Sequence, residues 1–241
     1  MKNAVIILAA GFGKRFCDEI YDKSSRRIFK QFLDINGKPV FLWSVETFES
    51  IKTFEQIIIV VPPMMIDELS LRYKKYKANF IIGGNERFDS VKKALSVVNR
   101  DIDFIAIHDA ARPLISRKDI LAVLRSAKKT GAAVAVEKIK DTVKLVSCND
   151  KKNINSKYIL KTLDRTVLRN AQTPQIFKSK IIKKAYFRNV KKIIAVTDDS
   201  QLVENLKINV SVVETKFPNF KITTRQDFEL AIAVFFLNKR Y

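Results

Sequence analysis

The sequence predicts an α/β fold with a mostly parallel sheet and helices on both of its faces. Short, continuous apolar runs indicate strands that are buried on both sides, as in the centre of a parallel sheet. Between these runs lie segments long enough for helices, in which apolar side chains recur at helical spacing. Strands that alternate with helices in this way are typical of a Rossmann-like arrangement, in which ligands bind at the carboxyl ends of the strands.

The elements alternate regularly through the first part of the chain. Buried strands are predicted at residues 5–8, 57–61, 80–82, 104–107 and 132–136. Helices are predicted from Pro39 as first residue, at 66–76, from Ser90 as N-cap, and at 117–130 with Gly131 as its end. Asn36-Gly37 indicates a turn, and the mixed-charge segment 16–29 indicates a mobile loop.

The pattern changes after Lys138. Polar and apolar side chains alternate at 141–146, a polar tip spans 149–157, and the apolar pattern returns at 158–163, which predicts a protruding β-hairpin arm over residues 138–166. A two-stranded ribbon alone is marginally stable in water, so we predict that a second copy of the chain covers it in a homodimer. Strands at 193–196 and 210–213 and a helix at 224–236 complete a single domain over residues 1–241.

Length and composition favour a globular protein. A chain of 241 residues with 47% hydrophobic content can bury a sizeable core. No apolar run is long enough for a bilayer span, and the first strand follows Met1-Lys2-Asn3 without a signal peptide or presequence pattern. We therefore expect a cytoplasmic protein without a membrane partner, in which Cys17 and Cys148 are free thiols.

A formal charge of +20 is typical of proteins that bind nucleic acid, so the distribution of the charge has to be considered. Most of the excess consists of single or paired lysines, and no basic block is interleaved with aromatic residues. We therefore expect no nucleic-acid partner and interpret the charge as a positive field that concentrates small anionic substrates. A basic nucleic-acid-binding or regulatory protein is kept as the alternative from another class.

The loop after the first strand has the composition of a phosphate site. Gly11 and Gly13 allow bare N–H groups to approach a ligand, and Lys14 and Arg15 add positive charge. The third glycine of the dinucleotide motif and the P-loop spacing are both absent. The loop therefore indicates phosphate, although an ordinary strand-to-helix turn with two solvated cations would have the same sequence.

Three loops are expected to meet at one edge of the sheet, because they all follow parallel strands. They are residues 11–15, 83–90 and 109–112. Asp109 at such a strand end suits a Mg²⁺ ion held mainly by substrate phosphates, or alternatively a helix cap or an ion pair with Arg112. His108, the single histidine, is expected to be packed rather than catalytic, and it leaves no partner for a His/Cys metal cluster.

Phosphoryl or nucleotidyl transfer matches this set of residues. Such reactions require positioning and charge neutralisation more than covalent chemistry by the protein. If the attacking group is a phosphate oxygen, it is already anionic and needs no general base. Arginine, lysine and Mg²⁺ would then suffice.

These motifs together resemble the 2-C-methyl-D-erythritol 4-phosphate cytidylyltransferases, a sugar-nucleotidyltransferase group of the non-mevalonate isoprenoid pathway. The resemblance covers almost the whole chain and rests on Leu8-Ala9-Ala10-Gly11-Phe12-Gly13-Lys14-Arg15, Lys30-Gln31-Phe32-Leu33, Gly83-Gly84-Asn85-Glu86-Arg87 with Ser90-Val91, His108-Asp109-Ala110-Ala111-Arg112-Pro113, Asp141-Thr142-Val143-Lys144, Asp164-Arg165, Gln172-Thr173-Pro174-Gln175, Thr197-Asp198-Asp199 and Asn219-Phe220-Lys221-Ile222-Thr223. It implies cytidylyl transfer from CTP to methylerythritol phosphate with Mg²⁺, and release of pyrophosphate.

The resemblance also implies roles for individual residues. The catalytic cations would be Arg15, Lys30 and Lys221. The nucleotide would contact Ala9, Ala10, Gly11, Phe12 and Gly13 through its phosphates, and Gly84, Asn85 and Ser90 through its base. The metal and the second substrate would contact Asp109, and the second substrate also Arg112, Thr142, Arg165, Thr197 and Lys221. Thr142 and Arg165 would reach the partner's site, so that arm exchange makes the dimer part of the active site.

Two features depart from the family pattern. Fourteen residues separate Arg15 from Lys30, which is longer than usual, and Phe29 stands where proline is common. Loop-closure entropy grows slowly with length, so the insertion is tolerable. In addition, Lys216-Phe217-Pro218 replaces a glycine-led turn before Asn219. The nearest alternative function is a cytidylyltransferase for ribitol 5-phosphate or another polyol phosphate, whose members tend to carry Asp-Ser-Val-Arg at 109–112 and lack Thr-Asp-Asp at 197–199.

Overall fold

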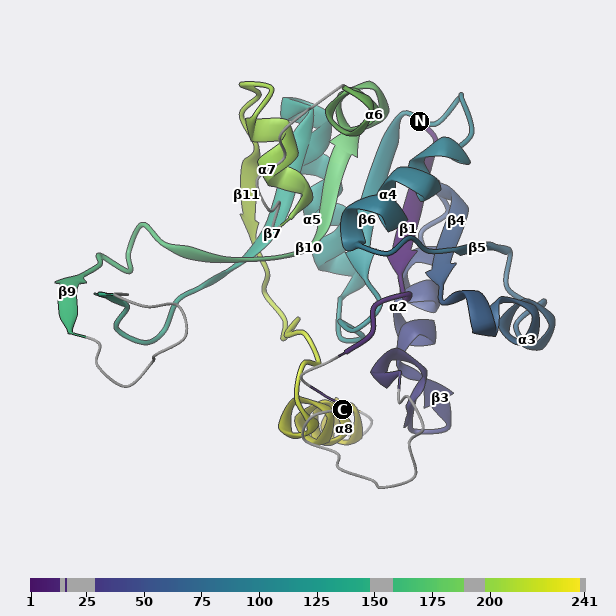
Figure 1. Ribbon diagram of the computed structural model, residues 1–241, viewed down its shortest axis with the longest axis horizontal. Coiled ribbons are helices and arrows are strands. Elements are labelled where there is room, and N and C mark those ends of the chain that lie inside the picture. The colour runs from purple at the N-terminus through teal and green to yellow at the C-terminus, as the bar shows by residue number, and fades with distance from the viewer. Residues whose placement is uncertain (14–15, 17–28, 148–157, 189–197, 239–241) are drawn as a thin grey trace.

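The computed structural model describes residues 1–13, 16, 29–147, 158–188 and 198–238. In this part of the chain a seven-stranded sheet has the order β11-β7-β10-β6-β1-β4-β5 (Figure 1). Its strands are β1 (Asn3–Leu8), β4 (Phe54–Val61), β5 (Ala78–Ile82), β6 (Phe104–Asp109), β7 (Ala132–Lys138), β10 (Arg169–Lys178) and β11 (Ser211–Glu214). All neighbours pair in parallel except β10, which is antiparallel to both β6 and β7. The prediction of a mostly parallel sheet is confirmed.

Helices cover both faces of the sheet, as predicted. Val5 and Ile7 of β1 face a core cluster with α2 (Val40–Glu49), α3 (Ile66–Arg72) and α5 (Arg117–Thr130). Ala4 and Ile6 face a second cluster with α4 (Arg87–Ser96), α6 (Ser179–Phe187) and α7 (Asp199–Glu204). Each fully buried aliphatic side chain in these clusters stabilises the fold by about 1.5–3 kcal/mol. Burial on both sides explains why the strand sequences are continuous apolar runs rather than alternating ones.

Two local predictions are confirmed in detail. Helix α5 spans the predicted residues 117–130, and Gly131 ends it in the left-handed region with φ of 89°. The structure adds its N-cap, Ser116, whose Oγ accepts a hydrogen bond from the backbone N–H of Asp119 at 3.0 Å. The two short strands β2 (Asp34–Ile35) and β3 (Lys38–Pro39) are joined by Asn36 and Gly37, whose φ values are 54° and 78°. Positive φ at both positions is what the Asn-Gly turn signal predicts.

Other local predictions are wrong. The N-cap of α4 is Glu86, which forms a reciprocal capping box with Asp89, so Ser90 lies inside the helix. Helix α3 ends at Arg72 instead of residue 76, and Pro39 precedes α2 as its N-cap instead of starting it. The sequence pattern predicts neither β10, α6 and α7 nor the 3₁₀ turns η1 (Lys30–Phe32) and η2 (Pro63–Met65).

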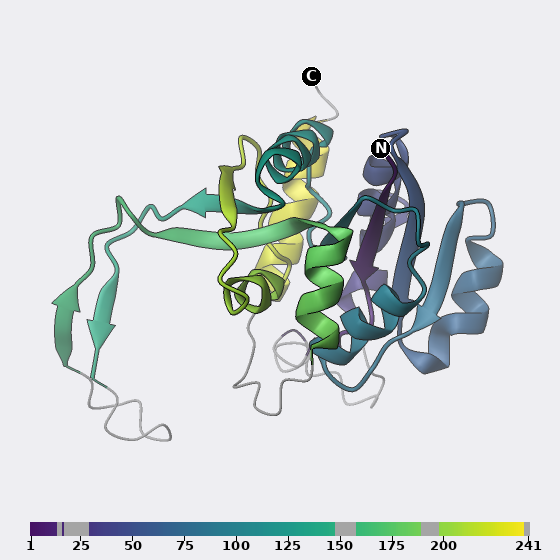
Figure 2. The same cartoon turned by 90° about the horizontal axis from the view of Figure 1, so that it is seen from above.

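The arm consists of β8 (Lys144–Val146) and β9 (Ile159–Thr162), which pair antiparallel and lie well away from the main sheet (Figures 1 and 2). Its exposed apolar side chains include Tyr158 at 74% and Leu160 at 63%. Helix α8 (Arg225–Asn238) lies below the sheet in Figure 1 and contributes Ala231 to a third cluster with Phe16 and Ile222. The predicted hairpin tip and the predicted strand at 193–196 lie outside the described residues.

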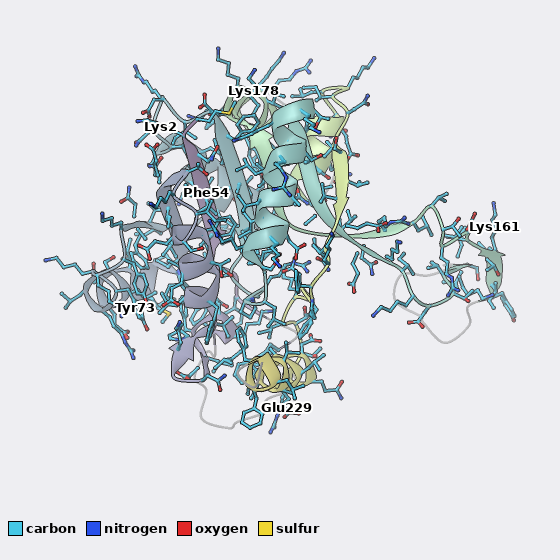
Figure 3. All side chains as sticks on the ribbon, turned by 180° about the vertical axis from the view of Figure 1, so that it is seen from behind. Lys2, Phe54, Tyr73, Lys161, Lys178 and Glu229 are labelled. Carbon is cyan, nitrogen blue, oxygen red and sulfur yellow. The ribbon has the colours of Figure 1, made fainter. Side chains whose placement is uncertain are left out.

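The surface is basic in many places rather than along one stripe. Figure 3 shows Lys2 and Lys178 exposed at one end of the body and Lys161 exposed far from them on the arm. This dispersed charge agrees with the spacing of lysines in the sequence. Among the described residues, no helix combines the length and the apolar character needed to cross a bilayer.

Candidate active site

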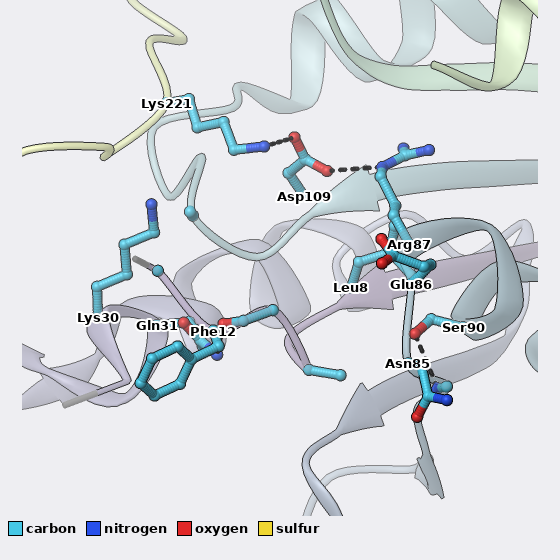
Figure 4. A pocket seen from close by; sticks show the side chains of 15 residues that line it. Leu8, Phe12, Lys30, Gln31, Asn85, Glu86, Arg87, Ser90, Asp109 and Lys221 are labelled. Carbon is cyan, nitrogen blue, oxygen red and sulfur yellow. Dashed lines mark hydrogen bonds and ion pairs between the residues drawn. The ribbon is translucent and has the colours of Figure 1, made fainter. Parts of the chain in front are cut away.

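The three loops predicted to meet at one edge do line a common cavity of about 460 Å³ (Figure 4). They follow β1, β5 and β6, and η1 and the segment around Lys221 close the cavity on other sides. Its lining residues are Leu8, Ala10, Gly11, Phe12, Gly13, Lys30, Gln31, Gly84, Asn85, Glu86, Arg87, Ser90, Asp109, Ala111 and Lys221. Most of the residues predicted to bind the nucleotide therefore lie in one place.

The loop after β1 is held by Gln31, a residue to which the sequence analysis assigned no role. Its Nε2 donates hydrogen bonds to the carbonyl oxygens of Ala9 at 2.6 Å and Gly11 at 3.1 Å. A Cβ on Gly13 would lie 3.3 Å from Cδ of Lys30, so glycine lets the lysine side chain pass close to the loop. Gln31 thus holds the backbone of the loop in place, and Gly13 leaves room for the Lys30 side chain beside it.

Phe29, which stands at the position of the family's proline, is anchored by aromatic contacts. Its ring lies 5.7 Å from that of Phe12 and 6.1 Å from that of Phe32, both edge-on. Lys30 follows Phe29 directly and is the first residue of η1. It is only 9% exposed and lies at the wall of the cavity. Lys30 therefore lines the cavity even though phenylalanine precedes it.

The loop after β5 is packed tightly against its surroundings. A Cβ on Gly83 would lie 2.5 Å from Cβ of Ala10, and a Cβ on Gly84 would lie 2.3 Å from Cβ of Asp89. Ser90 Oγ accepts a hydrogen bond from the N–H of Gly84 at 3.0 Å. Ser90 thus fixes the loop from within α4, and its hydroxyl remains oriented toward the cavity wall that Gly84 and Asn85 form.

Asp109 lies at the end of β6 among three cations. Oδ2 is 2.8 Å from Nζ of Lys221 and 3.8 Å from Nε of Arg112, and Oδ1 is 3.8 Å from Nε of Arg87. Burial acts to raise the pKa of Asp109, but the charges of Lys221, Arg87 and Arg112 outweigh it and hold the pKa well below its usual range. The carboxylate is therefore ionised. The predicted pairing with Arg112 is present, and Lys221 is the closer partner.

Arg87 also contacts a second carboxylate. Its Nη1 and Nη2 donate to Oδ1 and Oδ2 of Asp199 at 2.9 and 2.6 Å, and the hydroxyl of Tyr186 donates to Oδ1 at 2.5 Å. Asp199 is completely buried at the first position of α7. Burial and the neighbouring carboxylate of Asp199 raise the pKa of Tyr186 far above its usual value, so the phenol stays protonated. The sequence analysis assigned no role to these three residues.

His108 is packed, as predicted. Its Nδ1 lies 3.1 Å from Oγ1 of Thr173 and its Nε2 lies 3.2 Å from Oγ of Ser44, with no exposed surface. Burial lowers the pKa of His108 to about 4, so the ring is neutral near pH 7. Thr173 Oγ1 in turn accepts a hydrogen bond from the N–H of Asp109 at 3.0 Å. The histidine therefore supports the strand end that carries Asp109.

Arg112 does not line the cavity but anchors the segment that carries Lys221. Its Nη1 donates to the carbonyl oxygen of Asn219 at 2.7 Å, and Asn219 Nδ2 donates to the carbonyl oxygen of Thr173 at 2.8 Å. The N–H of Ile222 donates to the carbonyl oxygen of Ala111 at 2.8 Å. The segment after Lys216-Phe217-Pro218 is thus held on both sides of Lys221.

The remaining predicted residues lie elsewhere or outside the described chain. Thr142 and Arg165 are exposed at the base of the arm, away from the cavity of their own chain, and Arg165 donates to the carbonyl oxygen of Lys140. Arg15, Thr197, Cys17 and Cys148 lie outside the described residues. Ala9 is buried beneath the loop and contributes its carbonyl oxygen to Gln31.

Asp109 and Glu86 are the carboxylates that line the described cavity. Glu86 is engaged as the N-cap of α4. Among the described residues no group of three or more histidine, cysteine and acidic side chains is arranged to hold a metal ion. One carboxylate in a cation-rich cavity suits a Mg²⁺ ion that takes most of its ligands from phosphates and water.

The family model for 2-C-methyl-D-erythritol 4-phosphate cytidylyltransferase (IspD) matches residues 3–239 of this chain. The chain belongs to this family. A 2-C-methyl-D-erythritol 4-phosphate cytidylyltransferase from Endomicrobium trichonymphae is 65% identical over 233 residues, which cover 96% of this chain and 97% of the relative. The enzyme of the same name from Caldanaerobacter subterraneus is 35% identical and covers 99% of this chain and 100% of its own length.

Solved structures of cytidylyltransferases of this family have the same fold. The 4-diphosphocytidyl-2C-methyl-D-erythritol synthase of Anaerococcus prevotii superposes with a TM-score of 0.82 at 27% identity and covers 97% of this chain and 96% of that one. The 2-C-methyl-D-erythritol 4-phosphate cytidylyltransferase of Thermus thermophilus superposes with a TM-score of 0.76 at 29% identity, covering 97% and 98%. The similarity therefore extends over nearly the full length of each of these structures.

Proposed function

We propose that this protein transfers the cytidylyl group of CTP to 2-C-methyl-D-erythritol 4-phosphate. The products are 4-diphosphocytidyl-2-C-methyl-D-erythritol and pyrophosphate, and the reaction belongs to the biosynthesis of isoprenoid precursors. The observation that carries the proposal is the family match over residues 3–239, made by a chain whose predicted nucleotide-binding residues line one cavity. We propose the cytoplasm, which supplies CTP, as its compartment.

CTP is proposed to bind with its base at the loop after β5. Gly84, Asn85 and Ser90 form a wall with backbone and side-chain polar groups, and Gly84 packs closely against Asp89 of α4 behind it. A pyrimidine fits such a wall better than the larger purine ring. The triphosphate would then extend along residues 9–13, whose loop Gln31 holds in place.

The transfer needs no general base. An oxygen of the acceptor's phosphate attacks the α-phosphorus of CTP and forms a new P–O bond. The bond between the α-phosphorus and the oxygen bridging to the β-phosphorus breaks, and its electron pair leaves with pyrophosphate. The nucleophile is already anionic, so no proton has to be removed.

Cations that neutralise charge on the α-phosphorus are therefore the main catalytic groups. Lys30 and Lys221 line the cavity, and we propose Arg15 as the third such cation by resemblance. A preorganised donor aimed at charge that develops in the transition state contributes about 10²–10³-fold in rate. We propose that Asp109 and substrate phosphates hold Mg²⁺, which would supply further charge neutralisation.

The acceptor is proposed to bind between two chains. Arg112, Thr197, Lys221 and Asp109 would contact it from one protomer, and Thr142 and Arg165 from the arm of the partner. The proposal is supported by the exposure of Thr142 and Arg165 away from their own cavity and by the exposed apolar side chains of the arm. Apolar side chains on an isolated ribbon favour burial against a second copy.

The experiment that tests the proposed function measures pyrophosphate release from purified protein with CTP and Mg²⁺. Parallel reactions contain methylerythritol phosphate, ribitol 5-phosphate or no acceptor. Pyrophosphate release with methylerythritol phosphate alone supports the proposal. Release with ribitol 5-phosphate alone would show that the acceptor is ribitol 5-phosphate instead. No release in any of the three reactions, combined with steeply salt-dependent nucleic-acid binding, would favour the nucleic-acid alternative.

A further inference from the structure

Arg87 joins two carboxylates that belong to different parts of the fold. It is the first residue of α4, and its guanidinium forms a fork-like pair with the buried Asp199 of α7. The same side chain lies with Nε 3.8 Å from Oδ1 of Asp109, and Figure 4 shows it at the cavity wall opposite Lys221. Asp199 and Tyr186 do not line the cavity.

The pair with Asp199 gives Arg87 a fixed orientation. Two parallel N–H···O bonds define the plane of a guanidinium, whereas a lysine ammonium would be a single rotatable charge. Tyr186 donates to the same carboxylate at 2.5 Å, and its ring is stacked on that of Phe88 with centroids 4.8 Å apart. Asp199 therefore holds Arg87 from a position that a substrate does not reach.

The two oxygens of Asp109 consequently face different kinds of cation. Oδ2 pairs with Lys221, whose side chain is 40% exposed and which we propose to engage the substrates. Oδ1 faces Arg87, which is already fixed. When Lys221 turns toward a phosphate, two arginines stay beside the carboxylate: Arg112, whose Nε lies 3.8 Å from Oδ2, and Arg87, which is the cation on the Oδ1 side.

We propose that Arg87 is a positioning residue that acts on Asp109, and that Asp199 and Tyr186 act on catalysis through it. The inference rests on the proposed function. The loop that would read the base is held independently of the guanidinium, by the Glu86–Asp89 capping box, by Ser90 on Gly84 and by Lys93 Nζ on the carbonyl oxygen of Gly83 at 2.9 Å. Loss of the Arg87–Asp199 pair should therefore lower kcat more than it weakens CTP binding.

The test uses Arg87→Lys, Asp199→Asn, Tyr186→Phe and the double variant R87K/D199N. The control is Arg72→Gln, which breaks an exposed ion pair with Glu68 on α3. For each protein we would measure the thermal midpoint, the dissociation constant of CTP by calorimetry, and kcat and both KM values. A displacement of about 1 Å in an active site can cost roughly 10²-fold in rate, so we expect kcat to fall by about tenfold or more in R87K and D199N.

The expected result includes a CTP affinity within about threefold of wild type and a smaller loss of kcat in Y186F. The kcat of the double variant should be little lower than that of the poorer single variant, because both substitutions disrupt the same Arg87–Asp199 pair. The inference is overturned if R87K weakens CTP binding while D199N and Y186F behave as wild type, since Arg87 would then contact the nucleotide directly. It is also overturned if folded variants keep the wild-type kcat, or if stability, CTP affinity and kcat fall together. Inactive wild-type protein would instead contradict the proposed function.

Discussion

The Nζ atom of Lys221 lies 2.8 Å from Oδ2 of Asp109, although 112 positions separate the two residues in the sequence. Asp109 ends a buried strand, whereas Lys221 is carried by a segment pinned to Arg112 and Ala111. The carboxylate is ionised and forms an ion pair with the lysine that this segment carries to the cavity. The pair thus places a cation where a phosphate is proposed to react.

Replacing Lys221 with methionine should abolish most of the activity without unfolding the protein. Its side chain is 40% exposed, so little core packing is lost. We expect kcat to fall by about 10²–10³-fold, the usual cost of losing one group that stabilises transition-state charge. The matched control is Lys216→Met, an exposed lysine of the same segment whose backbone N–H, rather than its side chain, bonds Asp119. Equal rates for the two variants would contradict the role of Lys221.

Gly84 and Gly11 should respond differently to alanine. A Cβ on Gly84 would lie 2.3 Å from Cβ of Asp89 and 3.0 Å from its backbone carbonyl carbon, whereas a Cβ on Gly11 would meet nothing within 4 Å. Overpacking of this kind costs about 1–3 kcal/mol, so G84A should lower the free energy of unfolding in urea and weaken CTP binding. G11A should stay within about 0.5 kcal/mol of wild type. Equal stability of the two variants would show that the loop can shift.

The titration of His108, the single histidine, can be measured without overlap from other imidazole rings. Burial lowers the pKa of His108 to about 4, whereas the pKa of a histidine in the unfolded chain is about 6.5. As pH falls from 6.5 toward 4 the unfolded chain binds a proton that the folded chain does not, so stability decreases as pH falls through this window. Between pH 7 and 5 the loss from this residue is about 2 kcal/mol.

The titration can be followed by NMR of the imidazole ring in protein without a histidine tag, because the chain contains one histidine. A midpoint near pH 6.5 would contradict the neutral, buried state. The carboxylate of Asp109 has a depressed pKa, so its contribution to stability is lost only at lower pH, below the window assigned to His108.

Activity should be recovered by mixing two inactive variants if the arm completes the partner's site. Lys30→Ala would disable the cavity of its own chain, and Arg165→Ala would disable the arm that reaches across. In the mixed dimer one site carries both changes and the other carries neither, so random mixing restores about a quarter of the wild-type activity. No recovery, with mixed dimers demonstrated by mass spectrometry, would place both residues in the same chain's site.

The K30A variant alone tests whether Lys30 is a main catalytic cation. A fall in kcat of only a few fold would indicate that Arg26 or Arg27 replaces Lys30.

The sequence predicted the sheet and the meeting of its loops because both follow from local rules. Continuous apolar runs mark buried strands, and the ends of parallel strands share one edge, which places Gly11, Gly84 and Asp109 at that edge. The lysine at position 30 was placed by resemblance, and the structure adds Phe29 and Gln31 as the residues that hold its surroundings.

What the sequence did not predict depends on contacts between distant residues. Strand β10 contains Pro174 and several polar residues, features that argue against an interior strand, and its register with β7 shifts between Ala171 and Gln175. Arg87 and Asp199 are 112 positions apart, and no periodic pattern marks an ion pair across the fold. The error at Ser90 had a local cause, since Glu86, four residues before Ser90, is the N-cap and forms the capping box with Asp89.

The most direct measurement is ³¹P NMR of the reaction of CTP, Mg²⁺ and methylerythritol phosphate whose phosphate group carries ¹⁸O. The account predicts pyrophosphate and a product with two mutually coupled phosphorus signals, both shifted by an ¹⁸O atom in the bridge between them. That result would show that the acceptor's phosphate oxygen attacked the α-phosphorus. Formation of CMP, or of a product without phosphorus–phosphorus coupling, would contradict cytidylyl transfer to the phosphate.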